Sequence, residues 1–152
     1  MFILKKLRKL PRVSVLCLVF GSLLSVTPHV GAKGYDSIQT KCLAQNAYHE
    51  ARGEGEKGML GTIFVVLNRT KDSRFPSTPC KVIAQKNQFV WWGKGKTIKD
   101  PKEYDKAKQL VHEVLEGKYE DVTCGAIYFN AHHKSPKNSK FTVRIGNHSF
   151  FK

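Results

Sequence analysis

Apolar residues recur at helical spacing along two consecutive segments near the start of the chain. The first segment predicts a helix that begins at Asp36 or Ser37, either of which can cap it, and that ends at Ala51. A glycine-rich break follows, and a second helix is expected from Glu56 to Arg69. The second segment is apolar on nearly every side, which predicts a helix buried over much of its surface.

Capping signals mark two further helices. Pro79 is expected to open a short helix that runs to about Gln85. A longer helix follows Asp100, which can cap it, with Pro101 in its first position and Gly117 as its stop. The apolar residues between these two signals recur at helical spacing.

The last part of the chain has the pattern of strands. Residues 126–130 predict a short strand, and residues 142–151 predict a hairpin that turns at Gly146 and Asn147. Helices followed by a small sheet indicate an α+β fold that is mainly helical, with a C-terminal β-hairpin.

The first 32 residues differ from the rest of the chain. Five basic residues precede an apolar run at residues 13–26, and Val30-Gly31-Ala32 then offers a cleavage site of small residues. This layout is typical of a secretory signal peptide, and the run of about 14 residues is shorter than a membrane-spanning helix needs. We therefore expect a signal peptide at residues 1–32 and one domain at residues 33–152, with an uncleaved membrane anchor as the alternative.

The chain is strongly basic. Five of the 26 basic residues lie in the predicted leader, which leaves 21 against 12 acidic residues and a formal charge of +9. A basic exported protein is attracted to polyanions such as a cell wall, anionic lipid or nucleic acid. Export and the lack of a dense Lys/Arg stripe argue against nucleic acid, so an anionic wall surface is the expected partner.

Export also permits disulfides. The predicted domain holds Cys42, Cys80 and Cys124, an odd number that leaves one thiol over and does not fix the pairing. We favour Cys42–Cys80, which would tie the first helix to the segment after the second. No C-x-x-C pair is present, which argues against a structural zinc site.

Glu50 lies in the last turn of the first predicted helix, directly before the glycine-rich break. The negative end of the helix dipole disfavours a charged carboxylate, and desolvation by nearby aromatic residues would favour the protonated form further. A protonated carboxyl is what a general acid needs to protonate a leaving glycosidic oxygen. The alternative is a solvated glutamate paired with Arg52. Glu54 is expected to cap the second helix or to pair with Arg52, rather than to act as a second catalytic carboxylate.

Aromatic residues and histidines offer further chemistry. The aromatic residues at 89–92 and 128–129 suit either a sugar-stacking groove or core packing. His49, His132 and His148 are the histidines that could form a zinc site. The second histidine of an H-E-x-x-H motif is missing, however, and adjacent histidines in a strand point to opposite faces.

Seven short motifs occur in an order that resembles one protein family. They are Cys42-Leu43-Ala44, Tyr48-His49-Glu50-Ala51-Arg52-Gly53-Glu54, Val65-Val66-Leu67-Asn68-Arg69, Arg74-Phe75-Pro76, Gln88-Phe89, Gly125-Ala126 and Ile145-Gly146-Asn147-His148-Ser149-Phe150. Together they resemble the cell wall hydrolase family of the spore cortex-lytic enzymes (the SleB type), whose relatives include phage lysis enzymes. The resemblance extends over nearly all of residues 41–152.

This resemblance implies a lysozyme-like fold related to goose-type lysozyme and lytic transglycosylases. It implies that Glu50 acts as acid and then base in cleaving the peptidoglycan bond between N-acetylmuramic acid and N-acetylglucosamine, without a metal or other cofactor. We expect a monomer that acts on glycan strands and is held to the anionic wall by its charge. As residues of the substrate groove we nominate Tyr48, Asn68, Gln88, Phe89, Tyr128 and Arg144.

Two other classes of function stay open from the sequence alone. One is a cell wall amidase or endopeptidase, including a zinc-dependent version of either. The other is a non-catalytic cationic protein that binds walls. The sequence does not distinguish sporulation, wall remodelling or phage lysis as the biological setting.

Overall fold

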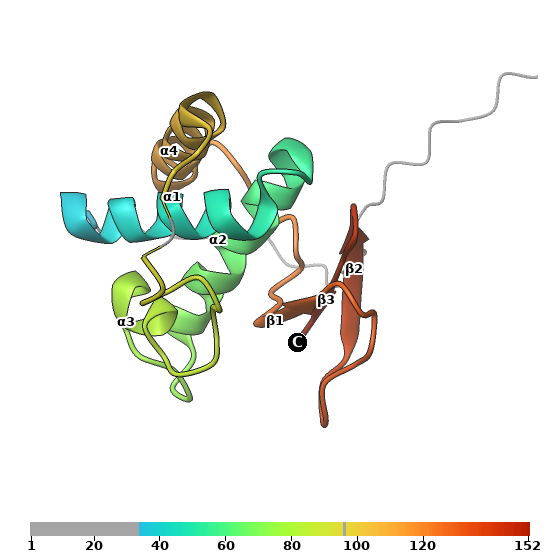
Figure 1. The fold of residues 1–152 in the computed structure, drawn as a ribbon. Coiled ribbons are helices and arrows are strands. Elements are labelled where there is room, and N and C mark those ends of the chain that lie inside the picture. The colour runs from blue at the N-terminus through green and yellow to red at the C-terminus, as the bar shows by residue number, and fades with distance from the viewer. Residues whose placement is uncertain (1–33, 96) are drawn as a thin grey trace, which may run out of the picture.

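A computed structural model describes residues 34–95 and 97–152 as a group of helices beside a small sheet (Figure 1). The elements are α1 (Ser37–Ala51), α2 (Gly55–Lys71), α3 (Pro79–Ile83), α4 (Pro101–Leu115), β1 (Tyr128–Asn130), β2 (Phe141–Ile145) and β3 (His148–Phe151). The expected α+β, mainly helical architecture with a C-terminal hairpin is thus confirmed. The predicted signal peptide, residues 1–32, lies outside the described residues. Within the described residues, no helix has the length and apolar character needed to cross a membrane.

The predicted caps account for where α1 and α4 begin. Asp36 accepts a hydrogen bond from the Gln39 N–H at 2.9 Å, and Asp100 accepts one from the Glu103 N–H at 3.1 Å. Each bond satisfies an amide that has no partner inside its helix. At the other end of α4, Gly117 has a φ of +79°, the left-handed conformation that glycine adopts easily.

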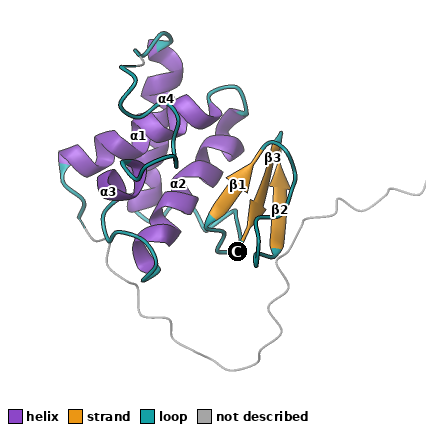
Figure 2. Cartoon of the chain, turned by 60° about the horizontal axis from the view of Figure 1, so that its bottom comes forward, coloured by secondary structure: helices purple, strands orange, loops and turns teal. Residues whose placement is uncertain are grey.

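Helix α2 lies between the other helices and the sheet (Figure 2). It packs against α1, α3 and α4, and it contacts β1 and β2 of the sheet. All residues from Gly58 to Leu67 are buried, which confirms the prediction of a helix buried over much of its surface. The fold therefore fixes α1, the helix that carries Glu50, against a rigid central element.

The three strands form an antiparallel sheet in the order β1-β3-β2. The central strand β3 is buried along its whole length, and the turn before it lies at Gly146 and Asn147, as predicted. Strand β1 begins two residues later than expected. The reason is that the Ala126 carbonyl accepts a hydrogen bond from the Asn68 side chain at 3.0 Å instead of joining a strand ladder.

The sheet approaches α2 closely at Gly61. A Cβ atom at this position would lie 2.6 Å from Cζ of Phe150, whose side chain is completely buried. Real Cβ atoms do not come so near a neighbour, so the aromatic ring of β3 can pack here only because residue 61 has no side chain. Val65 and Ala126 complete this small apolar cluster.

We expect Gly61→Ala to lower the free energy of unfolding by about 1–3 kcal/mol, because overpacking against Phe150 outweighs the helix preference of alanine. Urea denaturation would measure the change. Gly53→Ala is the matched control, since a Cβ there has nothing within 4 Å. Adding Phe150→Leu should recover part of the loss in a double-mutant cycle, and purely additive effects would contradict the proposed contact.

The predicted Cys42–Cys80 disulfide is present. It joins the first half of α1 to the first turn of α3, as expected from the sequence. The expectation of one leftover thiol is wrong, because Cys124 is not a free cysteine either.

Candidate functional site

Glu50 is the penultimate residue of α1 and is half-buried. The helix ends one residue later at Ala51, and Arg52 in the C-cap position donates its N–H to the Tyr48 carbonyl at 3.2 Å. Because Ala51 is buried against the core, this last turn is held in place rather than frayed. The structure therefore fixes the backbone of Glu50 at the negative end of a helix, as the sequence predicts.

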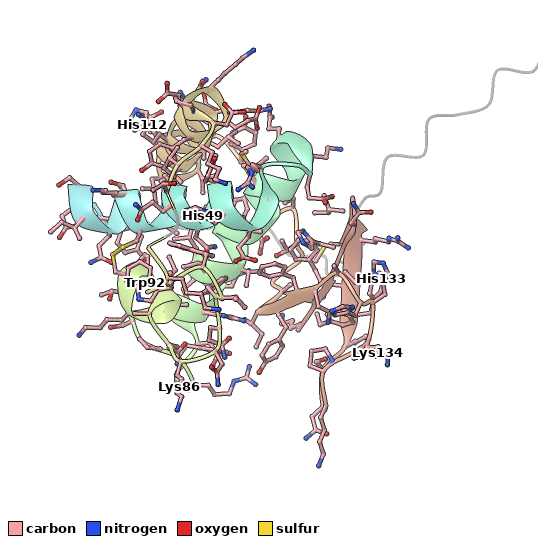
Figure 3. The ribbon with its side chains drawn as sticks, in the orientation of Figure 1. His49, Lys86, Trp92, His112, His133 and Lys134 are labelled. Carbon is pink, nitrogen blue, oxygen red and sulfur yellow. A yellow bond between two sulfur atoms is a disulfide. The ribbon has the colours of Figure 1, made fainter. Side chains whose placement is uncertain are left out.

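An aromatic stack covers His49, the residue before Glu50. The His49 ring lies parallel to Trp91, with ring centroids 4.6 Å apart and an interplanar angle of 26°. Trp92 meets Trp91 edge to face at 5.4 Å and is 37% exposed (Figure 3). The loop after α3 thus places one accessible indole ring close to the end of α1.

From the sequence, Tyr48 is nominated for the substrate groove, but the structure places this residue in the core. Its side chain has no exposed surface, and its hydroxyl accepts hydrogen bonds from the backbone N–H groups of Lys99 and Asp100 at 3.0 and 2.9 Å. The Arg52 guanidinium lies over its ring at 5.0 Å. Tyr48 therefore anchors the segment before α4 to the last turn of α1, and it has no surface to offer a substrate.

Glu54, the second glutamate of the E-A-R-G-E motif, holds the β2–β3 turn. Its carboxylate accepts hydrogen bonds from the Asn147 backbone N–H at 2.8 Å and from the Asn147 side-chain amide at 3.0 Å. These two bonds lower the pKa of Glu54 below its ordinary value, with a smaller contribution from His148. Glu54 makes no side-chain capping bond on α2, so the predicted cap is wrong.

Gly146 makes this contact possible. Its φ is +56°, and a Cβ there would collide with the Glu54 carboxylate. A long-range contact of this kind fixes the sheet against the end of the E-A-R-G-E motif. Glu54 is thus an ionised structural carboxylate.

Asn68, another nominated groove residue, also has structural contacts. Its side-chain amide donates to Asp121 at 2.8 Å and to the Ala126 carbonyl at 3.0 Å. Asp121 in turn accepts from the backbone N–H groups of Thr123 and Gly125 at 2.8 and 2.9 Å. This network fixes the loop that leads into β1 against α2.

Arg69 has a structural role in this region that the sequence did not predict. It is 4% exposed, and its Nε donates to the Ile127 carbonyl at 2.6 Å. Its guanidinium lies 5.1, 5.6 and 5.8 Å from the ring centroids of Phe75, Phe89 and Tyr128. Burial lowers the pKa of Arg69 to about 10, so it remains a cation at neutral pH and holds these rings by cation–π attraction.

Two of the nominated groove residues therefore meet around Arg69. Phe89 is buried, whereas Tyr128 is half-buried on β1. Gln88 is exposed on the loop beside Phe89, and Arg144 is exposed on β2 opposite Ser149. The structure thus brings Phe89 and Tyr128 together and leaves Gln88 and Arg144 accessible.

The three histidines nominated as zinc ligands do not form one group. Figure 3 shows His49 on α1, His112 on α4 and His133 beside the sheet, far apart from one another. His148 is buried, which lowers its pKa, and it packs against Phe129. Among residues 34–95 and 97–152, no three His, Cys, Asp or Glu side chains are grouped as metal ligands. The alternative zinc site of His49, His132 and His148 is therefore wrong.

The sequence matches the Cell Wall Hydrolase family over residues 53–151. The chain belongs to this family. The matched range contains Glu54, Asn68, Arg69 and the whole sheet, and it begins three residues after Glu50. The resemblance inferred from the short motifs is thereby confirmed.

Curated relatives of this Cell Wall Hydrolase chain are spore cortex-lytic enzymes. The protein from Oceanobacillus iheyensis is 32% identical over 104 residues, which are 68% of this chain and 36% of the relative. The protein from Bacillus cereus is 31% identical over 96 residues, which are 63% of this chain and 36% of the relative. The chain spans about a third of the length of these relatives.

Solved structures of the family have the same fold. The catalytic domain of the germination-specific lytic transglycosylase SleB from Bacillus anthracis is similar with a TM-score of 0.67 and 28% identity, over 79% of this chain and 98% of that domain. The SleB catalytic domain of Bacillus cereus gives a TM-score of 0.67 and 29% identity, over 79% of this chain and 94% of that domain. The lysozyme-like fold expected from the sequence is thus confirmed.

Proposed function

We propose that this chain is a peptidoglycan-cleaving enzyme that acts as a lytic transglycosylase, with Glu50 as general acid and then general base. Its family and the names of its relatives support an action on cell walls. The observation that carries the proposal is Glu50 itself, half-buried in the last turn of α1 and next in sequence to His49, which stacks on Trp91. The negative end of a helix disfavours a charged carboxylate.

The chemistry needs one carboxyl group. Protonated Glu50 donates its proton to the glycosidic oxygen between N-acetylmuramic acid and N-acetylglucosamine, and the bond from that oxygen to C1 of the muramic residue breaks. The resulting carboxylate accepts the proton of the muramic 6-hydroxyl. The 6-oxygen then bonds to C1, which closes a 1,6-anhydro ring and returns Glu50 to its protonated state.

The contacts of Glu54 favour this route over hydrolysis by two carboxylates. A hydrolase of that kind needs a second Asp or Glu within about 5–10 Å of the acid, free to act on water or on the sugar. Glu54 is the nearest carboxylate in sequence, but Asn147 engages both of its oxygens. The proposed reaction leaves Glu54 in its structural role.

We propose Gln88, Tyr128 and Arg144 as residues that contact the glycan strand, because each has accessible surface. Trp92 joins them as a platform for a sugar ring, since its indole is partly exposed and packs edge to face on Trp91. Phe89 is buried and supports this surface by its cation–π contact with Arg69. Tyr48 and Asn68 have a structural role: Tyr48 anchors the segment before α4, and Asn68 anchors the loop that leads into β1.

The proposal places the enzyme at the cell wall, outside the membrane. The leader predicted at residues 1–32 would bring it there, and the formal +9 charge of the rest would hold it to an anionic surface. We expect the active form to be a monomer.

Mass spectrometry of the products from purified sacculi tests the proposed reaction. The expected products are muropeptides that end in 1,6-anhydro-muramic acid. New reducing ends would instead show hydrolysis, and new free amines would show an amidase or endopeptidase. Wall binding with no cleavage product would contradict enzymatic activity altogether.

A further inference from the structure

A basic pocket lies at the end of α1 that carries Glu50. It has a volume of about 450 Å³ and is lined by His49, Arg52, Lys94, Gly95, Thr97 and Lys99. Three of these residues carry a full positive charge at neutral pH, and none of the described residues that line the pocket is acidic. The four ion pairs between described residues involve none of Arg52, Lys94 and Lys99.

The walls of this pocket are well anchored. Tyr48 accepts the backbone N–H of Lys99 and lies under the Arg52 guanidinium. His49 is stacked on the buried Trp91. Arg52 and Lys99 are thus attached to anchored backbone, so a ligand would meet charges that are already close together.

The pocket is lined by residues on either side of Glu50 in the sequence, and Glu50 is not one of the lining residues. His49 and Arg52 are three residues apart and so lie on the same side, whereas successive residues are rotated by about 100°. Glu50 shares this last turn of α1, one residue after His49 and two residues before Arg52. A strand that places its glycosidic bond at Glu50 would reach the pocket with a side branch rather than with its sugar backbone.

Peptidoglycan carries such a branch at each muramic residue. The backbone sugars are uncharged once the lactyl group is joined to the stem peptide, whereas the stem peptide ends in free carboxylates. Carboxylates form charge-assisted hydrogen bonds with guanidinium and ammonium groups. We propose that the pocket lined by Arg52, Lys94 and Lys99 binds a carboxylate of the stem peptide, and that the enzyme therefore selects strands whose stem peptides are free acids. This inference rests on the proposed function.

The test compares two forms of the same sacculi: native, and treated with carbodiimide and ammonium so that their carboxylates become amides. We expect the unaltered enzyme to release anhydro-muropeptides from native sacculi about tenfold faster than from amidated sacculi, at limiting enzyme and physiological salt. In Lys94→Gln/Lys99→Gln, the rate on native sacculi should fall to near the rate on amidated sacculi. The Lys99 bond to Tyr48 comes from the backbone, so these substitutions keep the anchor.

Lys71→Gln/Lys81→Gln is the matched control for overall charge. Both lysines are exposed, and Lys81 follows Cys80, which is bonded to the opposite half of α1. The control should keep the tenfold preference for native sacculi. If it loses the preference as well, general attraction to the wall is responsible and the pocket proposal is overturned.

The remaining outcomes separate the two proposals. Equal release of anhydro-muropeptides from both forms of sacculi would overturn the carboxylate pocket and leave the transglycosylase intact. Absence of anhydro products from both forms would overturn the proposed function. Lys94→Gln alone, on the exposed turn, gives an independent reading if the double variant folds poorly, and an unchanged preference in whichever of the two variants folds would also overturn the pocket.

Discussion

Glu50→Gln should lower the rate of anhydro-muropeptide release by about 1,000-fold or more, because one substitution removes both the acid and the base of the proposed reaction. Glutamine has nearly the same shape as glutamic acid but cannot donate a proton to the glycosidic oxygen. Binding to sacculi should change little, since the basic pocket and the aromatic platform remain. The measurement is the initial rate of product release by mass spectrometry, with wall binding followed by sedimentation.

Glu54→Gln provides the comparison for this result. Glutamine at position 54 can still accept a hydrogen bond from the Asn147 backbone with its amide oxygen, so the turn should stay near its place. We expect this variant to be modestly less stable and to keep most of its activity. A large loss of activity for Glu54→Gln together with a mild loss for Glu50→Gln would contradict the proposal, because it would show that Glu54 and not Glu50 has the catalytic role. Matching circular dichroism spectra would show that both variants are folded.

Local signals were sufficient to predict most of the fold. Asp36 and Asp100 cap the helices that follow them, and the hairpin turns at Gly146 and Asn147 as expected. These features depend on a few neighbouring residues, because a capping side chain bonds an amide three positions away and a turn depends on its own backbone angles. Strand β1 was placed less accurately, since its start depends on Asn68, which lies 58 residues before Ala126.

The roles of the polar site residues could not be predicted in the same way. Periodicity indicates that Tyr48 shares the apolar face of α1, but not that its hydroxyl is satisfied by amides about 50 residues later. Arg69 stands at the end of a helix, where a cation normally complements the dipole in solvent. Its burial among aromatic rings depends on Phe75, Phe89 and Tyr128 arriving from separate segments. Likewise, the Glu54–Asn147 contact joins residues 93 positions apart.

Removing the Cys42–Cys80 disulfide should have the second large effect, a loss of about 4 kcal/mol in the free energy of unfolding. The bridge closes a loop with a sequence separation of 38 residues, and in the chain-entropy account a loop of this length restricts the unfolded chain by roughly that amount. Cys42→Ala/Cys80→Ala is the suitable variant, because a reductant would not act selectively on this disulfide. Urea denaturation followed by tryptophan fluorescence would report the change.

The same experiment distinguishes how the disulfide stabilises the fold. If the bridge acts on the unfolded chain, its removal lets that chain expand, and the dependence of the unfolding free energy on urea should become steeper. If it acts mainly by holding α1 against α3, the slope should stay constant while the midpoint falls. Glu50 lies at the other end of α1 from Cys42, so the folded fraction of the variant should keep its rate of cleavage at low temperature. A loss below about 1 kcal/mol would show that the packing around Cys42, which is 6% exposed, is sufficient to hold the helix without the bridge.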